Sequence, residues 1–106
     1  MSSARLSQLL KFLEEDPYDP FNLYAVATEY RPRDPAQALI YYERLLREHP
    51  RYVPTYYHAA QLYLDREENE KAERTFRRGI QEATAQNDAL ALRELQNAYN
   101  EFLFEE

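Results

Sequence analysis

The apolar residues of the chain recur every three or four positions, the spacing that gathers them on one face of an α-helix. Six stretches show this pattern, and short polar or proline-containing segments separate them. No stretch alternates apolar and polar residues as a strand does, so the sequence predicts an all-α fold. We predict helices over residues 3–15, 20–31, 35–48, 54–66, 69–86 and 88–104. The expected buried stripes of the last two are Ala72, Phe76, Ile80 and Ala83, and Leu92, Leu95, Tyr99 and Phe102.

Prolines and capping residues explain where these helices should begin. Proline disfavours helix at the residue before it but fits the first helical turn. Asp19-Pro20 and Asp34-Pro35 each have the pattern of an N-cap followed by proline at the first helical position. Asn87-Asp88 is expected to cap the last helix in the same manner.

Composition narrows the class of protein. A chain of 106 residues suits one domain, and a net charge of -6 is unfavourable for a nucleic-acid binder. The absence of cysteine excludes disulfides and thiolate metal sites, and the single glycine excludes glycine-rich phosphate loops. The chain has no apolar run of membrane-spanning length and no signal-peptide segment. We therefore expect a cytoplasmic protein that binds neither membranes nor nucleic acid.

An internal repeat is the strongest pattern in the sequence. At an offset of 33 residues, prolines, alanines and tyrosines coincide, and at 34 residues an alanine and an aromatic position coincide. The pairs are Pro17/Pro50, Tyr24/Tyr57, Ala27/Ala60, Tyr30/Tyr63, Ala38/Ala72 and Tyr42/Phe76. A two-helix unit of this length is typical of a solenoid.

At these positions the sequence resembles the tetratricopeptide repeat (TPR) family, in its small bacterial type. Small residues are expected where paired helices cross, and large residues are expected to fill the gaps between units. The first repeat supplies Leu23, Ala27, Tyr30, Ala38, Tyr42 and Pro50, and the second supplies Tyr56, Ala60, Tyr63, Ala72, Phe76 and Gly79. Departures from the family pattern are Leu45 and Thr84 in place of a small residue and a proline, and Glu67 where a turn glycine is common.

The resemblance implies an α-α superhelix with two full repeats and flanking helices. We expect one domain over residues 1–106, divided into an N-terminal helix (1–19), two repeats (20–51 and 52–86) and a C-terminal capping helix (87–106). Solenoids need about three such units for stability, and the flanking helices complete that minimum.

The residues offer no catalytic constellation, so we expect a protein without enzymatic activity, cofactor or metal. His49 lies before a helix-ending proline, and His58 has no histidine or carboxylate three or four residues away. Both histidines are predicted to be hydrogen-bonded or exposed. A cluster of arginines could bind an anion or an acidic partner. The glutamates interspersed among them favour the alternative, a salt-bridged surface. The members of the cluster are Arg44, Arg47, Arg74, Arg77 and Arg78.

First helices of TPR repeats line a concave groove that receives peptides, so the resemblance implies a protein-interaction module whose partner is a peptide or protein. The groove positions are Phe21, Tyr24, Thr28 and Arg31 in the first repeat, and Pro54, Tyr57, Gln61 and Asp65 in the second. Tyr24 and Tyr57 suit recognition, but both could equally fill space beneath flanking helices.

The alternative function is self-assembly through the terminal helices. Tyr99, Leu103 and Phe104 are the candidate residues for a homodimer contact, because apolar residues on more than one side of a helix indicate more than one neighbour.

Overall fold

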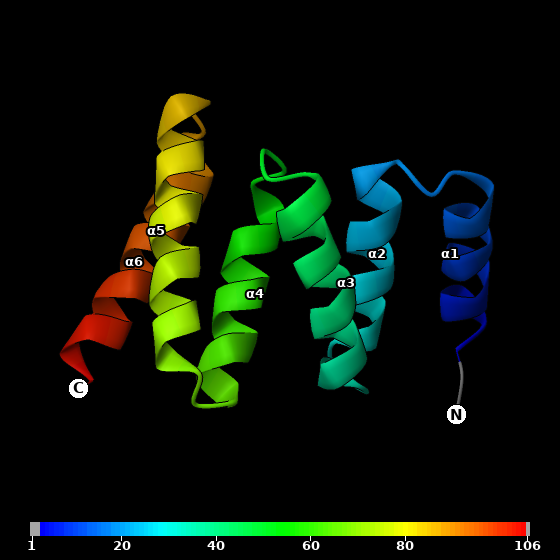
Figure 1. The fold of residues 1–106 in the computed structure, drawn as a ribbon, viewed down its shortest axis with the longest axis horizontal. Helices are drawn as coiled ribbons and strands as arrows, with labels where there is room; N and C mark the ends of the chain where they lie inside the picture. The colour runs from blue at the N-terminus through cyan, green and yellow to red at the C-terminus, as the bar shows by residue number, and fades with distance from the viewer. Residues whose placement is uncertain (1–2, 106) are drawn as a thin grey trace. The chain divides into compact units, whose positions relative to one another are not determined.

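A computed structural model describes residues 3–105, and this part of the chain is folded into six α-helices without a strand (Figure 1). The helices are α1 (Ala4–Glu15), α2 (Pro20–Tyr30), α3 (Pro35–Glu48), α4 (Pro54–Asp65), α5 (Asn69–Ala85) and α6 (Ala89–Phe104). No observed end lies more than one residue from its predicted position. The all-α prediction is therefore confirmed.

The helices form two compact units: an N-terminal unit that ends at Tyr52 and contains α1 to α3, and a C-terminal unit that begins at Val53 and contains α4 to α6. None of the helices within residues 3–105 combines the length and the apolar character that crossing a bilayer requires.

Helix starts in the N-terminal unit follow the predicted capping chemistry. The side chain of Asp19 accepts a hydrogen bond of 2.9 Å from the backbone N–H of Phe21, and Asp34 accepts one of 3.1 Å from Gln37. Each of these aspartates is followed by proline at the first helical position. Because proline lacks the N–H that the first turn would leave unpaired, the pair specifies the start of the helix.

The core of the N-terminal unit lies where α2 packs on α1 and on α3. Ala27 and Ala38 are fully buried, as expected for small residues at a close crossing of α2 and α3. Tyr30 differs from expectation, because it is only half-buried and stacks on Tyr41 with ring centroids 5.8 Å apart. The remaining core residues of this unit are Leu13, Leu23, Val26, Leu39, Tyr42 and Leu45.

Side chains tie the loop between α1 and α2 to its surroundings. The amide nitrogen of Asn22 donates to the backbone carbonyls of Phe12 (3.3 Å) and Asp16 (3.1 Å). From α3, the guanidinium of Arg44 donates to the carbonyl of Pro17 (3.2 Å). These bonds add partners for carbonyls at and just after the end of α1, where the carbonyl of Phe12 also accepts from the backbone N–H of Asp16.

In the C-terminal unit, α5 packs on α4 and α6, and α4 also contacts α6. The ring of Phe76 lies 5.7 Å from Tyr99 and 6.3 Å from Phe102, so the predicted seam between α5 and α6 is confirmed at these positions. Ile80 and Leu92 are only half-buried. On α5, the residues buried beside Phe76 are Ala72, Thr75, Gly79 and Ala83.

Two left-handed residues reverse the chain after α4 and after α5. Glu67 has φ 60° and Asn87 has φ 57°. After α4, the N–H groups of Glu67 and Glu68 donate to the carbonyls of Leu64 (3.0 Å) and Tyr63 (2.9 Å). The N–H groups of Asn87 and Asp88 repeat this arrangement after α5. Both turns are Schellman motifs, in which the left-handed residue is most often glycine.

Candidate binding surfaces

The groove positions predicted for the first repeat lie along one helix, α2. Phe21 is 59% exposed near its start, Thr28 is exposed, and Tyr24 is half-buried between them. Arg31 is the C-cap residue and is half-buried. The spacing of three, four and three residues places these four side chains on one side of α2.

Tyr24 is held by two further tyrosines. Its ring centroid lies 6.2 Å from that of Tyr42 in an edge-to-face arrangement and 5.6 Å from that of Tyr52. The hydroxyl groups of Thr28 and Tyr42 are hydrogen-bonded at 3.0 Å. Tyr24 therefore packs against other side chains of the N-terminal unit, which is one of the two roles that the sequence suggested for it. The residue is half-buried, so part of it stays accessible.

Burial raises the pKa of two hydroxyls in this cluster, those of Tyr42 and Tyr52. Burial raises the pKa of Tyr42, and the hydrogen bond to Thr28 acts in the opposite direction. Burial also raises the pKa of Tyr52, and the neighbouring Tyr24 and Asp19 raise it further. Of the two, only Tyr52 is partly exposed, and its uncharged hydroxyl can donate as well as accept.

The groove positions predicted for the second repeat lie along α4. Tyr57 and Gln61 are half-buried, while Pro54 and Asp65, the first and last residues of the helix, are exposed. The ring of Tyr57 meets that of His58 edge-on at 5.9 Å. The structure thus groups each of the two predicted sets along one helix, the first in the N-terminal unit and the second in the C-terminal unit.

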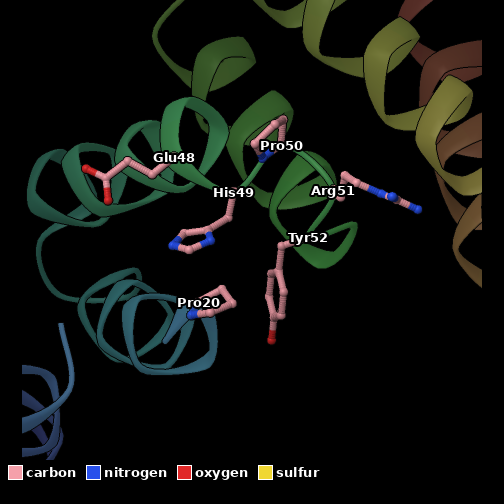
Figure 2. A pocket seen from close by; sticks show the side chains of 6 residues that line it. All are labelled: Pro20, Glu48, His49, Pro50, Arg51 and Tyr52. Carbon is pink, nitrogen blue, oxygen red and sulfur yellow. The ribbon is translucent and has the colours of Figure 1, made fainter. Parts of the chain in front are cut away.

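An open cavity of about 490 Å³, not anticipated from the sequence, lies in the N-terminal unit where α3 ends and α2 begins. Figure 2 shows the rings of His49, Tyr52 and Pro20 around a common space, whereas the side chains of Glu48 and Arg51 extend away from it. The remaining lining residue is Pro50. We call this site the His49 cavity. Its residues occupy helix ends and a loop, which helical periodicity does not describe.

His49 is the C-cap residue of α3, and its backbone N–H donates to the carbonyl of Leu45. Its side-chain Nε2 is buried and has no hydrogen-bond partner among the described residues. The residue as a whole is half-buried, and its ring lies beside Pro20 (Figure 2). A buried polar atom without a partner costs about 1–3 kcal/mol.

The arginine cluster consists in part of paired side chains. Arg44 forms an ion pair with Glu48 at 3.1 Å, and Arg77 forms a longer one with Glu73 at 3.9 Å. The Nε of Arg77 also donates to the hydroxyl of Tyr99 at 3.0 Å. These contacts favour the salt-bridged alternative over an anion site at Arg44 and Arg77.

The candidate oligomer residues on α6 have different surroundings. The hydroxyl of Tyr99 accepts from Arg77 and donates to Glu73 (3.2 Å), and its ring packs on Phe76 and Phe102. By contrast, Leu103 is 43% exposed and Phe104 is 89% exposed. Only the last two therefore present apolar surface at the end of the helix.

No group of three or more histidine, aspartate and glutamate side chains in the described part of the chain is arranged to hold a metal ion.

Comparison with known proteins agrees with a helical-repeat protein. The family profile described as tetratricopeptide repeat matches residues 30–95. A solution NMR structure of a tetratricopeptide repeat domain protein from Salinibacter ruber is 37% identical, with a TM-score of 0.79, and the match covers 86% of this chain and 93% of that one. A crystal structure of a tetratricopeptide repeat domain protein from the same organism is 36% identical with a TM-score of 0.79, covering 83% of this chain and 100% of that one. No curated protein matches the chain.

Paired antiparallel helices with a period near 34 residues define a helical repeat. The chain belongs to the tetratricopeptide repeat family. Domains of this family generally mediate protein–protein interaction and are typically non-catalytic.

Proposed function

We propose that this protein is a non-catalytic interaction module that binds a peptide or protein partner through its first-helix surfaces. The contact residues are Phe21, Tyr24, Thr28 and Arg31 on α2, and Tyr57, Gln61 and Asp65 on α4. The observation that carries the proposal is the preformed aromatic surface on α2. Its Tyr24 ring is restrained by Tyr42 and Tyr52, and Phe21 stands exposed one turn earlier.

A restrained aromatic surface favours binding for two reasons. Side chains that are already ordered lose little conformational entropy when a partner binds. Tyrosine also combines a large apolar ring with a hydroxyl that can pair with peptide groups. Phe21 adds apolar area that water otherwise covers, so a partner that buries it gains hydrophobic free energy.

A displayed library of random peptides tests this proposal. Peptides selected on the wild-type protein are expected to bind with dissociation constants in the micromolar range, roughly −8 kcal/mol. The double variant Tyr24→Ala/Tyr57→Ala should weaken binding about tenfold or more while its circular dichroism spectrum remains helical. Ile40→Ala is the matched control, because Ile40 is 58% exposed on α3 and lies outside the proposed surface. Unchanged affinity in the double variant would move the site elsewhere, first to the arginine cluster.

A second candidate function is self-assembly through the end of α6. The exposed pair Leu103 and Phe104 supports it, because solenoid ends are usually polar and apolar ends associate. Two copies of the chain would bury these side chains against each other as a homodimer.

Three further statements stay predictions. The first is that residues 1–106 form one domain divided at 19, 51 and 86, which the family match across both units supports. The second is that the protein has no enzymatic activity and no cofactor. The third is that it is cytoplasmic, and fractionation of host cells with an antibody to the protein checks this location.

A further inference from the structure

We propose that the His49 cavity is a proline-binding site, which anchors an extended peptide segment that carries a basic residue beside the proline. This inference rests on the peptide-binding function proposed above and adds the chemistry of the anchor. The cavity, its lining and the charges around it all lie within the N-terminal unit.

The lining of the cavity matches a proline side chain. Tyr52 and His49 contribute flat rings and Pro20 contributes a third apolar ring, and they surround a space of about 490 Å³ (Figure 2). That volume falls in the range of sites that take small ligand groups. Proline is flat and apolar, and a proline-rich segment is already extended, so docking it between rings costs little conformational entropy.

The imidazole of His49 supplies the polar contact. A polyproline II segment makes no internal hydrogen bonds, so its carbonyl oxygens are available to a donor. An imidazole N–H of His49 is the donor that the lining offers to such a carbonyl. Because Nε2 has no partner among the described residues, a peptide carbonyl would replace an unpaired state with a hydrogen bond rather than compete with an existing one.

The charge beside the cavity favours a basic peptide. Asp19 is the acidic residue that adjoins the lining, and the nearby cation Arg44, which donates to the carbonyl of Pro17, is already paired with Glu48. Asp19 is joined directly to Pro20 in the wall of the cavity. The guanidinium of Arg51, a lining residue, extends away from the cavity (Figure 2). A lysine or arginine next to the bound proline would therefore lie near the carboxylate of Asp19.

Tyr52 connects the cavity to the proposed binding surface on α2. Its ring lines the cavity and also lies 5.6 Å from the ring of Tyr24. A peptide anchored at His49 can therefore continue across Tyr24 toward Thr28, so one ligand uses both features.

Fluorescence anisotropy with defined peptides tests the inference. The probe is the labelled peptide Lys-Pro-Pro-Leu-Pro-Pro-Lys, titrated with the full chain at low ionic strength. Two control peptides replace every proline by alanine, or both lysines by glutamate. We expect the alanine peptide to bind about tenfold more weakly. The glutamate peptide should also bind more weakly, and added salt should reduce the difference between the two charged peptides.

Protein variants locate the binding site. His49→Ala should weaken binding of the proline peptide about tenfold, and His49→Asn, which keeps a donor, should recover part of it. Ile40→Ala on the same unit should have no effect. If His49→Ala does not fold, amide chemical shifts of the wild-type protein replace it, and the proline peptide should then shift Phe21, His49, Arg51 and Tyr52.

The outcomes separate this inference from the function on which it rests. Equal binding of the proline and alanine peptides, or unchanged binding by a folded His49→Ala variant, overturns the proline site. If library peptides still bind in a manner that depends on Tyr24 and Tyr57, the proposed interaction surface stands without it. Failure of both peptide sets overturns both.

Discussion

Gly79 of α5 and Tyr56 of α4 approach so closely that no methyl group fits between them. A Cβ atom at Gly79 would lie 2.6 Å from the Cβ of Tyr56 and 3.1 Å from the Cδ1 of Leu95. Tyr56 is fully buried, and a Cβ atom cannot move without its backbone. The one glycine of the chain therefore permits the crossing of α4 and α5.

Gly79→Ala should consequently destabilise the protein, by about 1–3 kcal/mol, through overpacking. Alanine is intrinsically about 1 kcal/mol better than glycine within a helix, so helix propensity alone predicts the opposite sign. Urea denaturation measures the difference. Gln81→Ala, at an exposed position of the same helix, is the control and should stay within about 0.5 kcal/mol. A more stable Gly79→Ala protein would contradict the observed crossing.

Glu67→Gly should stabilise the protein by about 0.5–1 kcal/mol. Glu67 has φ 60° in the turn after α4, a conformation that a side chain with a Cβ atom adopts at a cost and glycine adopts freely. Asn87→Gly is the informative comparison, because asparagine tolerates this region and should gain less. Thermal denaturation followed by circular dichroism distinguishes the two. A lower melting temperature for Glu67→Gly would mean that the contacts of its side chain outweigh the backbone strain.

Alkaline pH should destabilise the protein through its buried tyrosines. Burial is the largest cause of the raised pKa of Tyr41, Tyr42, Tyr52 and Tyr56 relative to the ordinary value of 10.0. The unfolded chain therefore loses these protons first as the pH rises. Their contribution to stability is fully present below pH 10.0 and is lost as the pH rises through the folded-state pKa values.

Near-ultraviolet absorbance of tyrosinate measures this effect. Native protein should titrate in a broad step that extends above the midpoint of the urea-unfolded chain. Tyr42→Phe should remove part of the late step, and Thr28→Val should delay it further, because the Thr28 hydrogen bond lowers the pKa of Tyr42. Superimposable titrations of folded and unfolded protein would contradict the burial of these hydroxyls.

Phe104→Ser should abolish a homodimer if α6 forms one. Phe104 is 89% exposed, so its removal leaves the packing of the C-terminal unit intact, and the variant should keep the wild-type melting temperature. Light scattering over a range of concentrations checks the mass of both proteins. A wild-type protein that stays monomeric at high micromolar concentration would exclude this alternative function.

The helices could be predicted because their signals are local. Asp19 and Asp34 cap helices whose first residue is proline, and these capping bonds involve neighbours only two or three positions away. The buried face of α5 was harder to predict. Thr75 is buried there because its hydroxyl donates to the carbonyl of Lys71 at 2.7 Å, and Gly79 is buried because two helices meet at it. Neither residue is apolar and large, so a stripe drawn through apolar positions favoured Ile80 instead.

The candidate sites were predictable only along helix faces. The family resemblance placed Tyr24 on the surface of α2, but the ring that restrains it from outside the helices, Tyr52, belongs to the loop after α3. The His49 cavity was missed for the same reason: it depends on residues far apart in the sequence, because Pro20 and His49 both line it. The Asp-Pro and His-Pro pairs indicated where helices begin and end, but not that these ends lie together.

Within each unit, nearly all helix packing joins elements that follow each other along the chain: α1 with α2, α2 with α3, α4 with α5, and α5 with α6. Such a topology has a low contact order, because most contacts close only a short loop. Each unit can therefore assemble without a slow search for distant partners, on the microsecond-to-millisecond scale typical of helical domains. A chain built this way can also be lengthened by one helical hairpin without changing the order in which the others form.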